Sequence, residues 1–195
     1  MSERHDALES RVVSSEDEPL ILVDEDDNEI GHLSKAACHN GEGVLHRAFS
    51  IFIFNNAGEL LLQQRSEEKR LWPGYWSNSC CSHPRRGELM DEAVNRRLLQ
   101  EIGMRSELHF LYKFSYHAPF GDVGSEREVC SVYAGRSTDE VRANPHEIAA
   151  WRWISAEDLD REMDARPGDF TPWFLQEWQE VRTSYRSVLG FGKRG

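Results

Sequence analysis

The sequence predicts a single α+β domain. Strand-like segments come in pairs on both sides of one helical stretch near the middle of the chain, and two further helical stretches follow at its end. Strands and helices do not alternate regularly, which argues against a parallel βαβ architecture. With 195 residues, of which 39% are hydrophobic and 29% charged, the chain is long enough for one domain with a sizeable core.

Turn signals divide the first half of the chain into two predicted hairpins. An Asp-Asp-Asn turn at residues 26–28 follows a short apolar segment. An Asn-Asn-Ala-Gly turn at residues 55–58 follows a segment dense in Phe and Ile, which predicts the strongest strand. Trp72 then begins a predicted loop that runs to Gly87. The strands expected before this loop cover residues 20–23, 29–33, 48–54 and 59–64.

One central helix and two later helices complete the predicted fold. Between Glu88 and Ile102 apolar residues recur at helical spacing, and Gly103 is a natural stop. Ser155 is a predicted N-cap, and Thr171 begins a longer helical segment. We expect helices over residues 88–102, 156–164 and 171–187, and strands over residues 108–116, 129–134 and 151–154.

The net charge of −11 is concentrated near the N-terminus. Residues 1–29 hold 11 acidic and 2 basic residues, whereas the rest of the chain holds 23 acidic and 21 basic residues. This balance argues against nucleic-acid binding through bulk charge. We expect a flexible acidic arm over residues 1–18, the α+β domain over residues 19–187 and a tail over residues 188–195.

The sequence has no predicted membrane span or signal peptide. Its start, MSERHDALES, is polar, and no apolar run approaches the length of a membrane-spanning helix. The four cysteines, two of them adjacent, do not form the pattern of a secreted disulfide framework. We therefore expect a cytoplasmic protein, a monomer or a weak dimer, that binds neither nucleic acid nor membrane.

The densest group of chemically active side chains is the sequence NSCCSHP at residues 78–84, in the loop that enters the central helix. A cysteine at such a place can be activated, because a helix N-terminus and nearby cations favour the thiolate. For these residues alone, a buried thiol pair and half of a structural zinc site are the alternatives.

Glu126 and Glu128 form a second group. In a strand both would point to the same face, which continues through Cys130 and Val132 and should therefore face inward. Two carboxylates on a buried face are unstable unless a cation or a proton joins them. Metal ligation, or one carboxylate acting as an acid, would relieve the repulsion. A frayed strand end with solvated glutamates is the alternative.

Three histidines complete a candidate metal site. His39 and His46 lie in an irregular stretch before the strongest strand, and each alone is typical of an ordinary loop histidine. Together with His83 and the two glutamates they offer three nitrogens and up to four carboxylate oxygens. That mixture suits a six-coordinate ion such as Mn²⁺, Mg²⁺ or Zn²⁺ better than a closed tetrahedral site.

Basic residues in several segments form a candidate anion site. Arg and Lys are the usual partners of phosphate, whereas surface solvation is the alternative for any one of them. The candidates are Lys35, Arg65, Lys69, Arg70, Arg85, Arg86 and Arg97.

Six short motifs together carry a resemblance to a known family. They are HRAFS at residues 46–50, WPG at 72–74, NSCCSHP at 78–84, RRL at 96–98, EIG at 101–103 and EREVC at 126–130. In these motifs the chain resembles the type 1 isopentenyl-diphosphate delta-isomerases over residues 19–180. The resemblance implies a Nudix-like fold, with a mixed β-sheet sandwiched by helices in a single domain.

The resemblance also implies a Nudix-like box on the central helix. In the superfamily this box has the form Gly-x5-Glu-x7-Arg-Glu-apolar-x-Glu-Glu-x-Gly. Alignment of Glu101 and Gly103 with its end puts Glu88 and Arg96 on their expected positions. Hydrolases use the box glutamates to hold metal and to shape a water nucleophile, so departures from the box argue against pyrophosphate hydrolysis. The departures are Ser82 for the leading glycine, and Arg97 and Gln100 for two glutamates.

The resemblance implies a role for each candidate residue. Cys81, two residues before His83, is the implied catalytic thiol, and Glu128 would act in proton transfer beside Tyr116. Glu101 would hold a second ion, Mg²⁺, against the substrate diphosphate, and Trp173 would face the reacting carbons. The implied ligands of the first ion are His39, His46, His83, Glu126 and Glu128. The implied diphosphate contacts are Lys35, Arg65, Lys69, Ser82 and Arg97.

The implied reaction is the isomerisation of isopentenyl diphosphate to dimethylallyl diphosphate, a step of isoprenoid biosynthesis. Protonation of the alkene generates a tertiary carbocation, which must be kept from water. An acid on one face, a thiolate on the other and an aromatic ring for the cation meet these needs. The alternatives are a Nudix hydrolase of nucleotide or other diphosphates and a non-catalytic metal-binding domain on the same fold.

Overall fold

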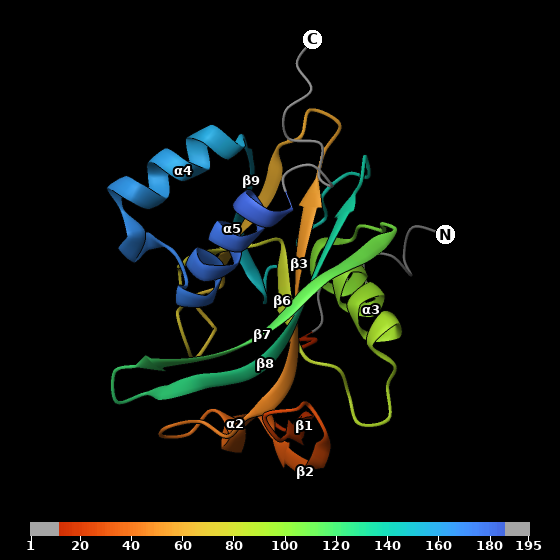
Figure 1. Cartoon of the computed structure of the whole chain (residues 1–195), viewed down its shortest axis with the longest axis vertical. Helices are drawn as coiled ribbons and strands as arrows, with labels where there is room; N and C mark the ends of the chain where they lie inside the picture. Colours follow the sequence, from red (N-terminus) through yellow and green to blue (C-terminus); the bar gives the residue numbers. More distant parts are fainter. Residues whose placement is uncertain (1–11, 186–195) are drawn as a thin grey trace.

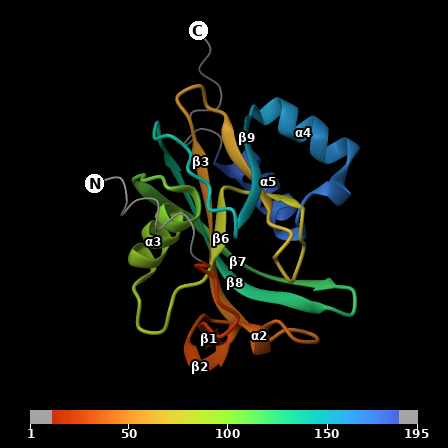
Figure 2. The ribbon, with the colours of Figure 1, turned by 180° about the vertical axis from the view of Figure 1, so that it is seen from behind.

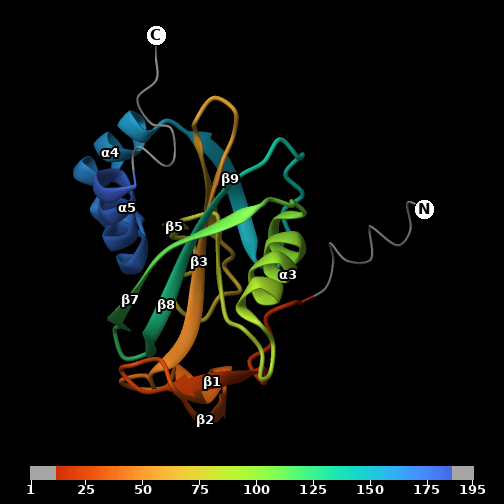
Figure 3. The same ribbon diagram turned by 45° about the vertical axis from the view of Figure 1, so that its right-hand side comes forward.

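The computed structural model describes residues 12–185, which form one mixed sheet between two helical layers (Figure 1). Figure 3 shows α3 (Met90–Ile102) on one face of the sheet and α4 (Ala156–Ala165) and α5 (Pro172–Ser184) on the other. The predicted α+β class, with a mixed sheet sandwiched by helices in a single domain, is confirmed.

The central strand of the sheet is β3 (His46–Phe54). The other strands in the described residues are β1 (Pro19–Val23), β2 (Glu29–Ser34), β4 (Leu60–Arg65), β5 (Trp76–Ser77), β6 (Cys80–Ser82), β7 (Leu108–Phe120), β8 (Gly124–Arg136) and β9 (Ile148–Ile154). β3 pairs in parallel with β8 and antiparallel with β1, β4 and β6. β7 pairs with β8, and β9 runs alongside β4, as the view from behind shows (Figure 2).

Both faces of β3 are buried. Phe52 and Phe54 belong to the apolar cluster that covers the inner sides of α4 and α5. Phe49, Ile51 and Ile53 belong to a second cluster beneath α3. A strand covered on both faces has no polar side to alternate with its apolar side. This explains the continuous apolar run that predicts the strongest strand.

Two predictions around the start of β3 were wrong. His46, expected in an irregular stretch, is the first residue of β3, where it pairs with Leu22 of β1 and with Glu128 of β8. Residues 80–82, expected in a loop, form β6 and pair with residues 49–51 of β3. Both segments obtain their strand partners from regions distant in sequence, which a local pattern does not reveal.

The β7–β8 hairpin is longer than predicted. The expected strands covered residues 108–116 and 129–134, whereas β7 extends to Phe120 and β8 begins at Gly124. Glu126 and Glu128 consequently lie within β8, opposite Ala118 and Tyr116. The alternative of a frayed strand end with solvated glutamates is therefore excluded.

The other predicted elements are confirmed to within three residues at each observed end. Residues 186–187 of the last predicted helix lie outside the described residues. A short helix α2 (Lys35–Cys38), the two-residue strand β5 inside the predicted loop and a 3-10 turn at Pro167–Asp169 were not predicted. None of the helices in residues 12–185 combines the length and the apolar character needed to cross a lipid bilayer.

Gly124 lets the β7–β8 turn approach the chain that carries His39. The φ angle of Gly124 is +155°, and a Cβ atom there would lie 2.1 Å from the carbonyl oxygen of His39. The backbone N–H of Ser125 donates to that same carbonyl at 3.1 Å. Only glycine fits such a close approach of two backbones, so Gly124 fixes the position of His39 relative to β8.

Replacement of Gly124 by alanine should therefore both destabilise the protein and displace His39. Overpacking and backbone strain together should lower the free energy of unfolding by about 3 kcal/mol. Gly121→Ala is the matched control, because its Cβ would meet nothing within 4 Å, and it should cost about 1 kcal/mol. Urea unfolding of the two variants checks the difference. Equal losses would show that the contact with His39 is easily relieved.

Candidate active site

Five buried side chains from four segments converge at the start of β3. Each offers one nitrogen or carboxylate oxygen, and these atoms all lie within 4.8 Å of one another. The residues are His39, His46, His83, Glu126 and Glu128. The same five residues form the candidate metal site predicted from the sequence.

Strand pairing explains the convergence. His46 and Glu128 are direct partners in the parallel ladder of β3 and β8. Glu126 lies two residues earlier on β8 and so shares the face of Glu128. His83 directly follows β6, which pairs with β3, and His39 is the C-cap of α2.

The three imidazoles direct their Nε2 atoms toward one centre. Nε2 of His46 lies 3.3 Å from Nε2 of His39 and 3.2 Å from Nε2 of His83. The carboxylates approach the same atoms. Glu126 Oε2 lies 3.0 Å from His39 Nε2, and Glu128 Oε1 lies 3.0 Å from His83 Nε2.

Contacts behind the cluster fix the orientation of its members. Nδ1 of His46 lies 2.7 Å from the carbonyl oxygen of Val44 and donates to it, so the lone pair of Nε2 faces the cluster. The hydroxyl of Tyr116 donates to Glu128 Oε2 at 2.6 Å. Glu126 Oε2 has no well-aligned hydrogen-bond donor among the described residues, although it lies close to His39.

The charges in the cluster shift the pKa values of its members. Burial alone would raise the pKa of Glu128, but His46 and His83 hold it well below its usual range. Burial lowers the pKa of His83 to about 4. The pKa of His46 is raised despite its burial, because Glu128 and Glu126 face it. Ionised carboxylates and an uncharged His83 are the forms that bind a metal ion.

The donor set fits a divalent metal ion. Imidazole nitrogens at 3.2 and 3.3 Å repel each other unless a proton or a cation lies between them, and one proton can join only one such pair. The buried carboxylates also need a compensating positive charge. Three imidazole nitrogens with carboxylate oxygens suit Mn²⁺, Mg²⁺ or Zn²⁺.

Cys81 lies in β6, directly opposite Ser50 of β3. Its Sγ is 2.7 Å from Asn78 Oδ1, to which the thiol donates, and 3.6 Å from Ser50 Oγ. Burial, together with the nearby Glu177, raises the pKa of this thiol to about 12. The segment that holds Cys81 was expected to be a loop that enters the central helix, but Cys81 lies in β6 and α3 begins only at Met90, so its place at a helix N-terminus was wrong.

The two adjacent cysteines have different surroundings. Cys80 is completely buried in the apolar cluster beneath α3, whereas Cys81 packs against the cluster on the side of α4 and α5. Neighbouring residues in a strand point to opposite faces, which accounts for the difference. All four cysteines of the chain are free thiols.

A cavity of about 300 Å³ lies next to the cluster. Cys81, Glu128, Tyr116 and Trp173 all line it. The indole of Trp173 stacks on the Tyr116 ring, with centroids 5.8 Å apart, and the Arg65 guanidinium lies 5.3 Å from the indole centroid. The structure thus brings the predicted thiol, proton-transfer pair and aromatic residue into one cavity.

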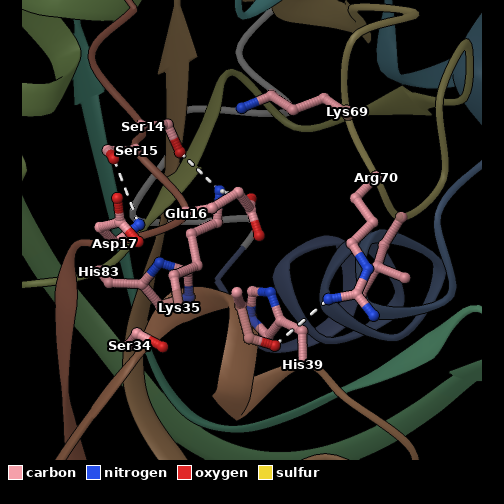
Figure 4. Close-up of polar contacts among 12 residues, drawn as sticks. Ser14, Ser15, Glu16, Asp17, Ser34, Lys35, His39, Lys69, Arg70 and His83 are labelled. Carbon is pink, nitrogen blue, oxygen red and sulfur yellow. Dashed lines mark hydrogen bonds and ion pairs between the residues drawn. The ribbon is translucent and has the colours of Figure 1, made fainter.

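The predicted anion-binding residues Lys35, Arg65, Lys69 and Ser82 also line this cavity. In Figure 4, Lys35 lies near His39 and His83, Arg70 lies on the side of His39, and Lys69 is farther away. Lys35 Nζ donates to Ser14 Oγ at 2.8 Å and lies 3.2 Å from Glu16 Oε1. Lys69 forms an ion pair with Glu147.

Arg97 and Glu101 are not among the residues that line the cavity. The Arg97 side chain is only 1% exposed, and its Nη2 lies 2.7 Å from Glu101 Oε1 and 3.7 Å from Glu147 Oε2. Although burial disfavours the charge, these carboxylates raise the pKa of Arg97. The expected roles of Arg97 toward diphosphate and of Glu101 toward Mg²⁺ stay predictions.

The alignment of the Nudix-like box agrees with the geometry of α3. Nε and Nη2 of Arg96 donate to the two carboxylate oxygens of Glu88, at 2.6 and 2.7 Å. Gly103 caps the helix with a φ of +70°. Arg97, at a box position where hydrolases carry a glutamate, instead pairs with Glu101.

Sequence reasoning missed Glu147, which lines the cavity and pairs with Lys69. Its carboxylate is 2% exposed and faces both Lys69 and Arg97. No local signal marks this residue, because a single glutamate in a polar loop before β9 is typical of a solvated surface. Only the tertiary structure places it among the cations.

Part of the predicted N-terminal arm contributes to the site. Residues 12–18 are described, and residues 1–11 lie outside the described range, so the flexibility of the arm stays a prediction. The backbone carbonyls of Glu16 and Glu18 accept hydrogen bonds from Ala36 and Lys35. Ser14, Ser15 and Glu16 line the cavity, as Figure 4 illustrates. The segment was missed because its acidic residues alone indicate solvation.

Comparisons with known proteins agree with this geometry. A model of the NUDIX domain family matches residues 44–174. The chain is 43% identical to isopentenyl-diphosphate Delta-isomerase 1 of Photorhabdus laumondii, over 88% of this chain and 99% of the relative. It is 46% identical to isopentenyl-diphosphate Delta-isomerase of Burkholderia multivorans, over 81% of this chain and 89% of the relative. Among solved structures, the protein DR0079 of Deinococcus radiodurans matches with a TM-score of 0.62 and 27% identity, over 76% of this chain and 90% of that chain.

Removal of the histidine ligands should abolish metal binding. The double replacement of His39 and His46 by alanine removes two of the three converging nitrogens, so the variant should lose tightly bound Mn²⁺ or Zn²⁺ after dialysis. Elemental analysis measures the metal content of each protein. His109→Ala, an exposed histidine of β7, is the matched control. Full metal occupancy in the double variant would exclude this ligand set.

Proposed function

The chain belongs to the isopentenyl-diphosphate Delta-isomerase family and carries its Nudix domain, and we propose that it converts isopentenyl diphosphate into dimethylallyl diphosphate. One observation supports this most strongly. The cavity combines a thiol, a carboxylate–phenol pair and an indole with several cations. This combination of groups is suited to an allylic proton shift on a diphosphate ester.

The cations would bind the diphosphate end of the substrate. Lys35, Arg65, Lys69 and Arg70 line the cavity, and Lys and Arg bind phosphate oxygens through charge-assisted hydrogen bonds. Lys35 and Lys69 are paired with Glu16 and Glu147 here. A diphosphate would compete with these carboxylates for the ammonium groups. Arg97 and Glu101, which lie next to this group, would act on the diphosphate and on its Mg²⁺.

Two groups would carry the protons of the reaction. One proton is added to the terminal carbon of the alkene. Another leaves the methylene that is bonded to the internal alkene carbon, so the substrate and the product contain the same number of hydrogen atoms. Burial and Glu128 raise the pKa of Tyr116 well above its usual value. Tyr116 therefore keeps its proton and shares it with Glu128 Oε2. Cys81 on β6 is the second proton-transfer group, since its thiol lines the same cavity.

The aromatic residues would shelter the cationic species between the two proton transfers. Trp173 is 2% exposed and Tyr116 is 8% exposed, so this part of the cavity has little contact with solvent. An indole face stabilises a nearby cation by about 2 kcal/mol when both are desolvated. Exclusion of water also prevents capture of the carbocation.

A divalent ion fits the group formed by His39, His46, His83, Glu126 and Glu128. When bound, it would supply positive charge that orients Glu128 and sets its protonation state. The Tyr116 hydroxyl would still donate to Glu128 Oε2, whereas the other oxygen, Oε1, faces His83. The location proposed for the enzyme is the cytoplasm, and the proposed state is a monomer or a weak dimer.

Incubation with isopentenyl diphosphate and Mg²⁺ tests the proposed function. The purified protein should form dimethylallyl diphosphate, and in D₂O the new methyl group should gain deuterium, because the added proton comes from an exchangeable acid. Mass spectrometry and NMR measure both results. Release of phosphate from nucleoside diphosphates without isomerisation would instead favour a hydrolase. Metal binding without turnover of either substrate would favour a binding domain.

The two adjacent cysteines should differ in their importance. Cys81→Ala removes the thiol that lines the cavity and should abolish isomerisation with the fold intact. Cys80→Ala changes a completely buried core residue on the other face of β6, so it should lower stability by about 1 kcal/mol but keep most activity. Turnover and circular dichroism of both variants check this expectation. Equal loss of activity in the two variants would overturn the assignment of Cys81.

A further inference from the structure

The N-terminal segment of residues 12–16 lies against cations of the candidate diphosphate site, although the proposed reaction does not use it. Four of its residues line the cavity. None of residues 12–17 is buried, so packing in the core does not explain the position of the segment. Polar contacts with cations hold it there instead.

Lys35 is bound by two oxygen atoms of the segment. Its Nζ donates to Ser14 Oγ at 2.8 Å, a contact visible in Figure 4, and lies 3.2 Å from Glu16 Oε1. The Lys35 side chain is 12% exposed, whereas that of Glu16 is 47% exposed. Charge-assisted hydrogen bonds to oxygen are also what an ammonium group offers to phosphate. The segment therefore uses the same donors that a diphosphate would use.

Arg97 is covered by the same segment. Its Nη1 donates to the backbone carbonyl of Val13, and its Nη2 faces the carboxylates of Glu101 and Glu147. Arg97 does not line the cavity, whereas the residues on both sides of Val13 in the chain do. The segment consequently lies between Arg97 and the cavity. This cover helps to explain why a residue expected to contact a diphosphate is only 1% exposed.

Backbone hydrogen bonds hold the segment at its C-terminal end. The N–H of Ala36 donates to the carbonyl of Glu16, and the N–H of Lys35 donates to the carbonyl of Glu18, each at 2.9 Å. The carboxylate of Glu18 also forms an ion pair, and β1 begins at the next residue. Exposed chain with few hydrogen bonds opens at a small cost in free energy. Residues 12–16 can therefore move while Glu18 stays in place.

We propose that the N-terminal segment is an internal competitor of the diphosphate and that Glu16 sets the affinity of the site for this anion. Oxygens of the segment occupy Lys35 and Arg97 until a diphosphate binds. The diphosphate carries more negative charge than one carboxylate, so it displaces the segment and gives Arg97 access to the cavity. An occluded site binds with an affinity reduced by the fraction of open molecules. This inference rests on the proposed function, because it concerns the diphosphate site of that reaction.

Loss of the Glu16 charge should therefore strengthen anion binding. In Glu16→Gln the Kd for inorganic pyrophosphate should fall about fourfold, which is the size expected for a partly exposed ion pair. The KM for isopentenyl diphosphate should fall by a similar factor with kcat unchanged, because the competition affects binding alone. Isothermal titration calorimetry of the full chain with Mg²⁺ and steady-state turnover measure these constants.

Asp17→Asn is the matched control. It removes the same charge from the adjacent residue, whose carboxylate forms no ion pair within residues 12–185. Because salt and water screen an exposed charge that makes no contact, the Kd should stay within about 1.5-fold of the wild-type value. A difference between the two variants therefore reports the contact of Glu16 with Lys35.

Amide hydrogen exchange tests the displacement itself. The N–H of Ala36 loses its acceptor when Glu16 moves away, so saturating pyrophosphate should raise its exchange rate about threefold or more. The N–H of Lys35 keeps its acceptor on Glu18, and its exchange rate should stay unchanged. NMR resolves the two amides in the wild-type protein.

Three results would overturn the competition. Equal tightening in Glu16→Gln and Asp17→Asn would show a general effect of charge. Unchanged or weaker binding in Glu16→Gln would show that the carboxylate does not compete. Slower or unchanged exchange at Ala36 with pyrophosphate would show that the segment stays in place or closes over the anion. A wild-type protein that does not bind pyrophosphate would instead refute the diphosphate site, and with it the proposed function.

Discussion

The burial of Glu126 and Glu128 on one face of β8 is the constraint on which the site depends. Two carboxylates with little access to water need nearby positive charge or protons, and the fold supplies three imidazoles around them. The parallel pairing of β3 with β8 places His46 next to Glu128. The close contact of Gly124 with the backbone of His39 brings another imidazole to the same point. Much of the geometry of the site thus follows from the need to compensate the negative charges of Glu126 and Glu128.

A second group of polar side chains lies on the neighbouring side of the cavity. Ser50 and Glu177 are buried and Cys81 is half-buried, and the thiol donates to Asn78 rather than facing a cation. The His/Glu cluster and this group meet at the cavity that Trp173 lines. Glu128 and its partner Tyr116 belong to the cluster and Cys81 to the second group, so the residues proposed for proton transfer come from both.

The sequence by itself determined the fold class and the family, and it named the five His and Glu residues that the fold brings together. Alternation along residues 126–134 indicated that Glu126 and Glu128 share an inward face, because side chains alternate along any strand whatever its partners. The box spacing put Glu88 and Arg96 in one motif on or beside one helix, and in the structure these two residues form an ion pair. Such relations depend on local geometry, which a short stretch of chain already contains.

Only the tertiary structure decided which distant segments complete the site. Residues 80–82 form β6, and His46 belongs to β3, because both pair with strands that are distant in sequence. A local pattern does not reveal such pairing. Cys81 has a raised pKa through burial, whereas its sequence position suggested activation at a helix end. Glu147 and Glu177 acquire their surroundings from loops and strands that no local pattern connects to them. Burial and long-range pairing are properties of the packed chain, so residues that depend on them carry no signal of their own in the sequence.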